Sequence, residues 1–251
     1  MKPELTYGLH SVQSLLKSAP TKIESLILLD SRHDQRLKKI HHLAERAGVT
    51  IILSKREAMD ALCDGNHQGV IANVTGGDLF GEKDLYAQIE ASPQTSLILI
   101  LDGVTDPHNL GACMRSADAA GVTAVIVPKD NSVGLTEVAR KVACGAAENI
   151  PLIVVTNLSR CMDKLQALGV WVTGTAGEAT LNHFDSDLSL PRVIVMGAEG
   201  KGMRRLTRDY CDTLVRIPMA GSVSSLNVSV AAGVLLFEAV RQQHVLETTI
   251  D

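Results

Sequence analysis

The chain has 251 residues, of which 45% are hydrophobic and 21% charged, and its formal net charge is −4. This composition is typical of a folded globular protein and allows one large domain or two smaller ones. No apolar run approaches the roughly 20 residues that a membrane-spanning helix needs, and the first residues lack a signal-peptide pattern, so we expect a cytoplasmic protein that is not bound to a membrane.

Residues 1–75 predict a small α/β domain. Helical and extended patterns alternate along them, with predicted helices at 8–18, 34–47 and 55–62 and predicted strands at 23–29, 49–53 and 69–74. This segment carries ten Lys and Arg against eight Asp and Glu. Its basic cluster, residues 32–39, is typical either of a solvated helix face or of a patch that contacts phosphates. Charge alone leaves both interpretations open.

Residues 76–95 predict a linker. They contain three glycines, one proline and scattered charges, without a long apolar period. This composition is typical of a connection with a helical turn or two.

Residues 96–251 predict a larger α/β domain. Its predicted strands are 97–101, 123–127, 151–155, 170–173, 192–196 and 213–217, and its predicted helices are 109–120, 135–147, 157–168, 203–209 and 225–243. Apolar strands that alternate with helices indicate a parallel sheet covered on both faces. Ligands of such sheets bind beyond the carboxyl ends of the strands. We therefore expect the functional residues in the loops that leave those ends.

The cofactor motifs of the most common enzyme classes are missing from these loops. The first strand is not followed by G-x-G-x-x-G, which argues against a nicotinamide enzyme, and the chain has no G-x-x-x-x-G-K-[ST] phosphate loop. The five cysteines are odd in number and never form a C-x-x-C pair. We therefore expect no metal site and no disulfide framework, and we expect the cysteines and Trp171 to be core residues.

Three of the loops carry polar and glycine-rich motifs. They read Asp106-Pro107-x-Asn109-x-Gly111-Ala112-x-x-Arg115-Ser116-Ala117, then Met196-Gly197-x-Glu199-Gly200-x-Gly202, and last Ile217-Pro218-Met219 running into Ser224-Ser225-Leu226-Asn227-Val228-Ser229. In this order they resemble the signature motifs of the SpoU/TrmH class of RNA 2′-O-methyltransferases. Tyr7-Gly8-x-His10 and His67-Gln68-Gly69 resemble the substrate-binding domain of one subgroup, the bacterial 23S rRNA guanosine-2′-O-methyltransferases. The resemblance covers practically the whole chain.

The resemblance implies a fold that the hydrophobic pattern cannot give. It implies an N-terminal domain similar to ribosomal protein L30 (L30e-like) over 1–75 and a SPOUT-type parallel-sheet domain with a deep trefoil knot over 96–251. Knots are rare among protein folds, so this expectation comes from the resemblance alone. It also implies a homodimer with the site near the interface.

The implied reaction is transfer of a methyl group from S-adenosylmethionine to a ribose 2′-hydroxyl. The subgroup modifies a guanosine in the P loop of 23S rRNA, so the implied partner is 23S rRNA or a ribosomal precursor. Two alternatives stay open: methylation of a tRNA ribose, and a non-catalytic rRNA-binding assembly factor. The polar residues of the three motifs favour an enzyme, because a scaffold for docking does not need them.

The family pattern also assigns roles to single residues. Arg115 corresponds to the arginine that activates the ribose hydroxyl, with Asn109 beside it. A guanidinium is effectively always protonated, so we expect Arg115 to stabilise the developing alkoxide or to grip the adjacent phosphate, and we leave the proton acceptor open. Otherwise Arg115 would be an exposed helix residue, and Asn109 would complete a helix start capped by Asp106.

The second and third motifs supply the remaining candidates. Glu199 is either a carboxylate near a helix start or an acid that positions Asn109 or Arg115. Ser225 and Asn227 are either helix caps or part of the catalytic centre. The expected cofactor-binding residues are Gly197, Ile217 and Leu226, whose alternative role is packing. His10 and His67 are either RNA contacts or structural residues.

Overall fold

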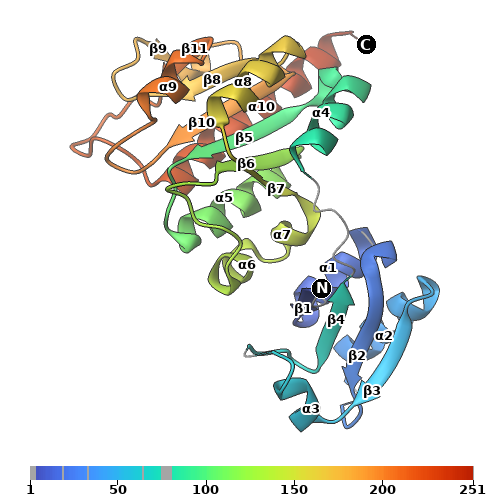
Figure 1. Cartoon of the computed structure of the whole chain (residues 1–251). Helices are drawn as coiled ribbons and strands as arrows, with labels where there is room; N and C mark the ends of the chain where they lie inside the picture. Colours follow the sequence, from blue (N-terminus) through green and yellow to red (C-terminus); the bar gives the residue numbers. More distant parts are fainter. Residues whose placement is uncertain (1–3, 19, 33, 64, 75–80, 251) are drawn as a thin grey trace. The chain divides into compact units, whose positions relative to one another are not determined.

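Two units, Met1–Leu79 and Phe80–Asp251, make up the chain (Figure 1). The computed structural model describes residues 4–18, 20–32, 34–63, 65–74 and 81–250. None of the helices in these ranges is long and apolar enough to cross a membrane. Residues 76–80, the start of the predicted linker, lie outside the described residues.

The first unit contains a mixed sheet in the order β1-β4-β2-β3. Its strands are β1 (Glu4–Tyr7), β2 (Ile23–Leu29), β3 (Thr50–Ser54) and β4 (Val70–Val74). β4 runs antiparallel to both of its neighbours, whereas β2 and β3 are parallel. The helices are α1 (Leu9–Ser18), α2 (Gln35–Arg46) and α3 (Arg56–Asp60), with a 3-10 turn at Pro20–Lys22. The predicted helices and strands are present, and β1 is a short strand that the hydrophobic pattern did not reveal.

His67 has a structural role in the first unit. Its imidazole is buried, and Nε2 lies 2.8 Å from Oδ1 of Asp60. Nδ1 accepts the backbone N–H of Gly69 at 3.0 Å, so the proton belongs on Nε2, where it is donated to Asp60. Of the two interpretations of His67, the structure therefore supports the structural one. The side chain of His10 lies outside the described residues.

The second unit is built on a parallel sheet in the order β7-β6-β5-β10-β8-β11-β9. The strands are β5 (Leu97–Asp102), β6 (Ala124–Pro128), β7 (Leu152–Val155), β8 (Trp171–Thr175), β9 (Leu181–Asn182), β10 (Arg192–Gly197) and β11 (Thr213–Arg216). Every pair of neighbours runs parallel. This confirms the predicted α/β class with a parallel sheet.

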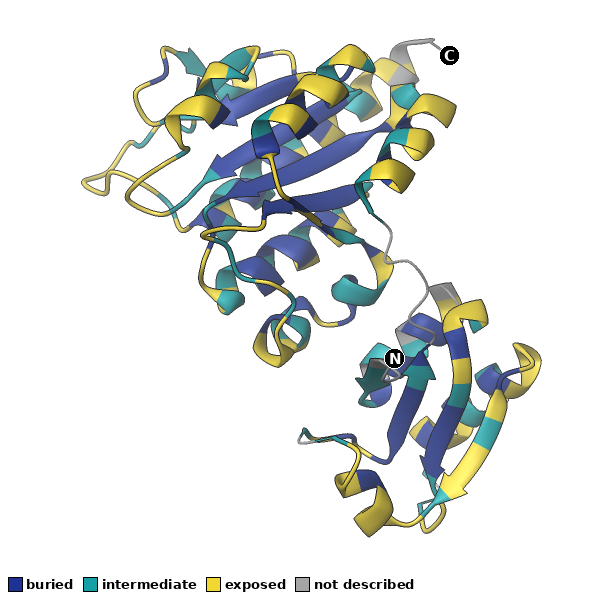
Figure 2. Ribbon diagram, in the orientation of Figure 1, coloured by how far each residue is buried: buried dark blue, intermediate teal, exposed yellow. Residues whose placement is uncertain are grey.

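Helices cover both faces of this sheet. They are α4 (Glu82–Ala91), α5 (Pro107–Ala119), α6 (Glu137–Ala143), α7 (Ala146–Asn149), α8 (Leu158–Ala167), α9 (Arg205–Asp209) and α10 (Val228–Ile250), with 3-10 turns at Pro93–Thr95 and His183–Asp185. β5 is buried along its whole length (Figure 2). Its Leu99 belongs to a core with α5 and α10, and its Ile98 and Ile100 belong to a core with α4 and α8. Burial on both faces explains why this strand is apolar at every position except its last.

The structure corrects several sequence expectations in this unit. Half of the predicted linker is helix α4, whose Leu85 and Ile89 lie one helical turn apart and are fully buried. The predicted helix 135–147 is broken into α6 and α7, because Cys144 and Gly145 adopt left-handed backbone conformations. α10 runs on to Ile250 instead of ending near residue 243. Trp171 is not a core residue: it is the first residue of β8 and is 57% exposed.

Gly111 sets the distance between α5 and α6. A Cβ atom on Gly111 would lie 2.5 Å from the carbonyl oxygen of Ala139 and 2.8 Å from Cβ of Val142. A backbone oxygen cannot move away as a flexible side-chain end can. Close packing of the two helices therefore requires glycine at this position of the first motif.

We predict that Gly111→Ala destabilises the protein. Alanine would gain about 1 kcal/mol of helix propensity, but forcing extra volume into a packed interface typically costs about 1–3 kcal/mol or more, so the denaturation midpoint of the second unit should fall. Urea unfolding followed by circular dichroism measures this. Gly134→Ala is the matched control, because its Cβ would meet nothing within 4 Å. An equal midpoint for Gly111→Ala and wild type would contradict the packing argument.

Candidate active site

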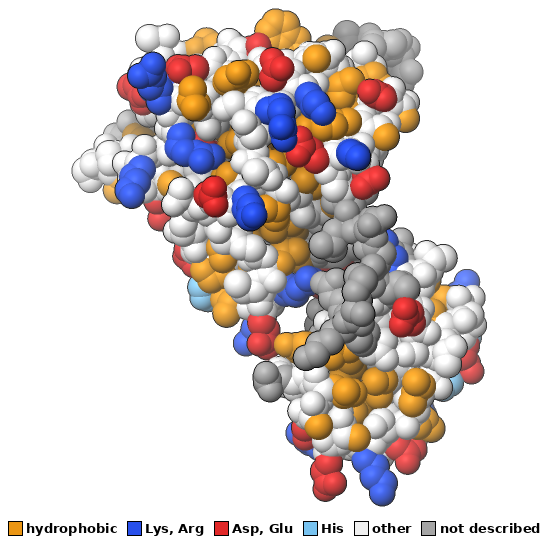
Figure 3. All heavy atoms as spheres, in the orientation of Figure 1, with side chains coloured by type: hydrophobic (Ala, Val, Ile, Leu, Met, Phe, Trp, Pro, Cys, Tyr) orange, Lys and Arg blue, Asp and Glu red, His pale blue; other side chains and the backbone are white. Residues whose placement is uncertain are grey.

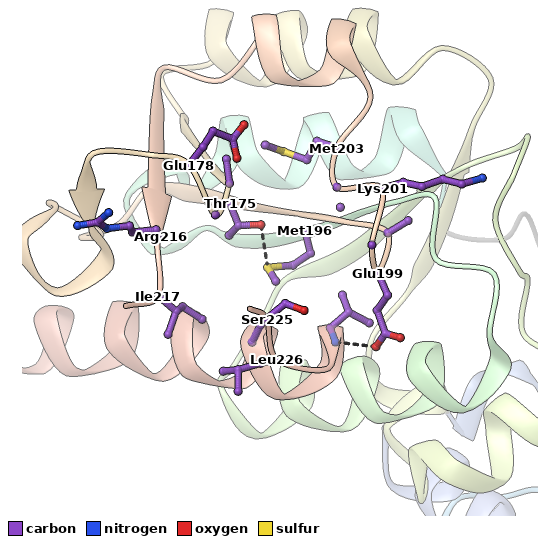
Figure 4. Close-up of a pocket in the computed structure, with 18 of the residues that line it drawn as sticks. Thr175, Glu178, Met196, Glu199, Lys201, Met203, Arg216, Ile217, Ser225 and Leu226 are labelled. Carbon is purple, nitrogen blue, oxygen red and sulfur yellow. Dashed lines mark hydrogen bonds between the residues drawn. The ribbon is translucent and has the colours of Figure 1, made fainter. Parts of the chain in front are cut away.

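A cavity of about 440 Å³ opens at the carboxyl ends of β8, β10 and β11 (Figure 4). Segments that follow each of these strands line it: Thr175–Glu178, Met196–Met203 and Arg216–Ile217, together with Ser224–Leu226. Ile217 and Leu226 lie on the side of α10, and Glu178 and Met203 lie across from them. The cavity is therefore at the sheet edge where ligands of parallel sheets bind.

The loop after β10 folds back on its own strand. The backbones of Ala198 and Gly202 exchange two hydrogen bonds, of 2.8 and 3.2 Å. A Cβ atom on Gly197 would lie 2.2 Å from the backbone of Gly202 and Met203. Gly200 and Gly202 adopt left-handed conformations with φ of +74° and +69°. The glycine spacing of the second motif thus allows a tight return that other residues would obstruct.

Glu199, at the tip of this loop, connects all three sequence motifs. Its Oε1 accepts hydrogen bonds from Nδ2 of Asn227 at 2.7 Å, the backbone N–H of Val228 at 3.0 Å and Nδ2 of Asn109 at 3.3 Å. Nδ2 of Asn227 also donates to Oδ1 of Asn109 at 2.9 Å. We call Asn109, Glu199 and Asn227 the polar network. It joins the first turn of α5, the glycine loop and the start of α10.

The start of α10 suits an anionic partner. Asn227 accepts the backbone N–H of Ser229 at 3.0 Å in the manner of a helix cap. The carboxylate of Glu199 accepts a hydrogen bond from the backbone N–H of Val228, the first residue of the helix. N–H groups in a first turn lack partners within the helix and carry partial positive charge. Glu199 therefore fixes the glycine loop to the beginning of α10.

Comparisons with known proteins find relatives over nearly the whole chain. The SpoU rRNA Methylase family matches residues 96–237, and the RNA 2′-O ribose methyltransferase substrate binding family matches residues 5–77. The chain belongs to the SpoU rRNA methylase family. It is 57% identical, over 96% of its length and 98% of the relative's, to the 23S rRNA (guanosine-2′-O-)-methyltransferase RlmB of Pseudomonas putida.

Solved structures show the same fold. The SpoU methyltransferase AviRb of Streptomyces viridochromogenes matches with a TM-score of 0.78 at 24% identity, covering 97% of this chain and 90% of AviRb. The AdoMet-bound rRNA methyltransferase of Sinorhizobium meliloti matches with a TM-score of 0.71 at 25% identity, covering 94% of this chain and 86% of the other.

Most of the residues proposed from the sequence gather at this site of the SpoU methylase. Gly197, Ile217 and Leu226, expected to bind the cofactor, all line the cavity, as do Glu199 and Ser225. Asn109 and Asn227 join them through the polar network. Of the two partners considered for Glu199, the structure supports Asn109.

Arg115 does not join this group within one chain. It is exposed on α5, and its Nη1 lies 3.8 Å from Sγ of Cys144. Six residues of helix turn the side chain by about 240° and advance it by about 9 Å relative to Asn109. The two residues therefore point in different directions, and the expected contact between Asn109 and Arg115 is not made.

One wall of the cavity was missed by the sequence interpretation. The loop after β8 contributes Thr175, Gly177 and Glu178, and no motif marked it. The position of β8 beside β10 is the signal that could have revealed it, since their carboxyl ends meet at one edge. Glu178 pairs with Arg208, and hydrogen bonds from its own backbone and from Arg208 lower the pKa of its carboxyl group.

The charges on the face of the second unit shown in Figure 3 are mixed, with Lys and Arg next to Asp and Glu. The residues near the cavity are mixed in the same way. Lys201, Arg208 and Arg216 line it together with Glu178 and Glu199. Among the described residues, no group of three His, Cys, Asp or Glu side chains could hold a metal ion.

The cysteines fall into two classes. Burial raises the pKa of the Cys113 and Cys211 thiols to about 12 and that of Cys161 to about 11. Cys144 is exposed, contrary to the expectation of a core position, and Cys63 is half-buried. The thiolate is the reactive form of cysteine.

We predict that iodoacetamide at pH 8 alkylates Cys144 in the folded protein and spares Cys113, Cys161 and Cys211. A raised pKa means that these three thiols stay protonated until the pH exceeds about 11, and packing also blocks access to Cys113 and Cys161, which are fully buried. Peptide mapping by mass spectrometry reads out each site, with urea-unfolded protein as the control in which all five cysteines react. Modification of Cys113 at the rate of Cys144 in folded protein would contradict the described core.

Proposed function

We propose that this chain transfers the methyl group of S-adenosylmethionine to the ribose 2′-oxygen of a guanosine in 23S rRNA. The observation that carries the proposal is the convergence of three motif loops on one cavity, in a chain 57% identical to an RlmB methyltransferase over nearly its full length. More specifically, we propose that the methylated guanosine lies in the P loop and that the substrate is 23S rRNA or a ribosomal precursor. Such a substrate places the enzyme in the cytoplasm.

The cavity suits S-adenosylmethionine in size and chemistry. Its volume of about 440 Å³ is that of a small-molecule site. Met196, Ile217 and Leu226 offer apolar surface for an adenine ring, and the folded-back loop offers backbone groups for the polar parts. Charged side chains of both signs line the cavity and can meet the polar and charged ends of the ligand. When bound, S-adenosylmethionine supplies a methyl group on a positively charged sulfonium.

The reaction forms a bond from the 2′-oxygen to the methyl carbon while the carbon–sulfur bond breaks, and the hydroxyl proton leaves to an acceptor. The chain must therefore hold the ribose in line and favour the developing alkoxide. We assign the second task to Arg115, whose permanent charge suits an alkoxide or a neighbouring phosphate better than it suits a base. The polar network holds the loops in place around the cavity, which Ser225 lines.

We also propose the finer features of the fold that the family implies. A deep trefoil knot is supported by membership of the SpoU family and by the path of the chain: β11 lies beyond β8 in the sheet, whereas α10, which follows it, packs against α5 and β10. An L30e-like RNA-binding role for the first unit is supported by the match of residues 5–77 to a substrate-binding family.

A homodimer is supported by two observations. Large apolar side chains of α10 are exposed, including Val230 at 52% and Phe237 at 50%, and such a surface marks an interaction site. Arg115 also lies outside the cavity of its own chain. We therefore propose that the dimer brings Arg115 of one copy toward the cavity of the other.

The test of the substrate is methyl transfer from labelled S-adenosylmethionine to unmodified 23S rRNA, with bulk tRNA as the competing substrate. We expect incorporation into 23S rRNA only, mapped to a guanosine 2′-oxygen. Incorporation into tRNA instead would redirect the proposal to a tRNA ribose. Binding of rRNA without any transfer would support an assembly factor and contradict the enzyme.

We predict that Arg115→Ala lowers the single-turnover rate about 10²–10³-fold, the usual effect of removing one preorganised electrostatic group. Dimerisation and cofactor affinity should stay close to wild type, because Arg115 is outside the cavity. Arg115→Lys keeps the charge but not the planar fork. Little rescue by lysine would indicate bidentate positioning, and substantial rescue would indicate charge stabilisation. Turnover of the alanine variant within about threefold of wild type would refute the assignment.

A further inference from the structure

A fully buried carboxylate lies at the carboxyl end of β5, outside the polar network. The side chain of Asp102 has no exposed surface, and both of its oxygens accept hydrogen bonds from one residue. Oδ2 accepts the backbone N–H of Arg204 at 2.9 Å, and Oδ1 accepts Nε–H of the same arginine at 2.6 Å. A buried carboxylate is costly unless it is paired in this way.

The position of this pair relates it to the glycine loop. Asp102 on β5 is the register partner of Gly197 on β10, so the loop leaves the sheet beside Asp102. It returns to Asp102 at Arg204. Between these points, residues 197–203 line the cavity. Asp102 therefore closes the base of the same loop whose tip Glu199 fixes to α10.

We propose that Asp102 is a positioning residue that holds the glycine loop in the conformation that binds S-adenosylmethionine. This inference rests on the proposed function. Neither Asp102 nor Arg204 lines the cavity, so the pair acts through the loop and not by touching the cofactor. Without it, the loop would spend only part of its time in the binding conformation, and the apparent affinity would fall in proportion.

This role has a kinetic signature. A bound cofactor stabilises the binding conformation of the loop, so at saturating S-adenosylmethionine the variant enzyme should carry the same arrangement as wild type. The KM for S-adenosylmethionine should rise while kcat changes little. A residue that only stabilises the fold would lower the denaturation midpoint and leave KM unchanged.

Asp102→Asn in the full-length chain tests the proposal. The amide is nearly isosteric but can accept from only one of the two donors of Arg204 while its own N–H₂ faces the other. We expect the dissociation constant for S-adenosylmethionine, by calorimetry, and its KM to rise about ten- to a hundredfold, with kcat within about threefold of wild type. Asp187→Asn is a control for the same substitution in a second aspartate–arginine pair: Asp187 is exposed and lies 3.6 Å from Arg192 at the opposite end of β10, and its variant should keep the wild-type KM.

Arg204→Ala and Arg204→Lys keep the test valid if Asp102→Asn does not fold. Both retain the backbone N–H bond to Asp102 and lose the Nε bond, so KM should rise less, about three- to tenfold. An unchanged KM in folded Asp102→Asn would overturn the inference. If Asp102→Asn does not fold, an unchanged KM in folded Arg204→Ala would overturn it. A loss of kcat without a change in KM would overturn it as well. Absence of S-adenosylmethionine binding by wild type would instead overturn the proposed function, and this inference with it.

Discussion

The arrangement of the site depends on a single carboxylate oxygen. Oε1 of Glu199 accepts hydrogen bonds from N–H groups of Asn109, Asn227 and Val228, which lie on the first and third motif segments. A hydrogen bond to an ionised acceptor is about twice as strong as a neutral one, and here three donors converge on one atom. Because the parallel sheet already brings the motif loops to one edge, Glu199 has only to fix their final positions.

The glycine loop can place Glu199 because its backbone is held at both ends. At its base the loop folds so closely on Gly197 that no side chain fits there, and Asp102 receives the returning backbone at Arg204. At its tip Glu199 meets the start of α10. Together these contacts restrict the backbone that forms one wall of the cavity.

The sequence predicts this architecture where one physical signal dominates. Strands buried on both faces, such as β5, are apolar throughout, and the order of strands and helices then leads to a parallel sheet. Helix α4 was predicted only as a helical turn or two within a linker, because its buried surface consists mainly of two side chains, Leu85 and Ile89, among charged residues. Trp171 was wrongly predicted as a core residue because aromatic residues are common at buried strand positions, whereas its side chain at the start of β8 is 57% exposed.

Site residues could be predicted as members of motifs, but the choice between their possible partners could not. That Glu199 would bind Asn109 and not Arg115 depends on helix rotation and loop closure, which no spacing in the sequence encodes directly.

The geometry also separates residues that hold the site from residues free to react. Both ends of the Asn109 amide and of the Asn227 amide are engaged within the protein. Side chains so engaged can orient neighbours but cannot readily turn to a substrate. Arg115 is exposed, and its Nη1 lies 3.8 Å from the sulfur of Cys144, so its guanidinium can still turn to a substrate. We therefore infer that the polar network shapes the cofactor side of the site, whereas the ribose side is completed by Arg115 when RNA and a second copy of the chain are present.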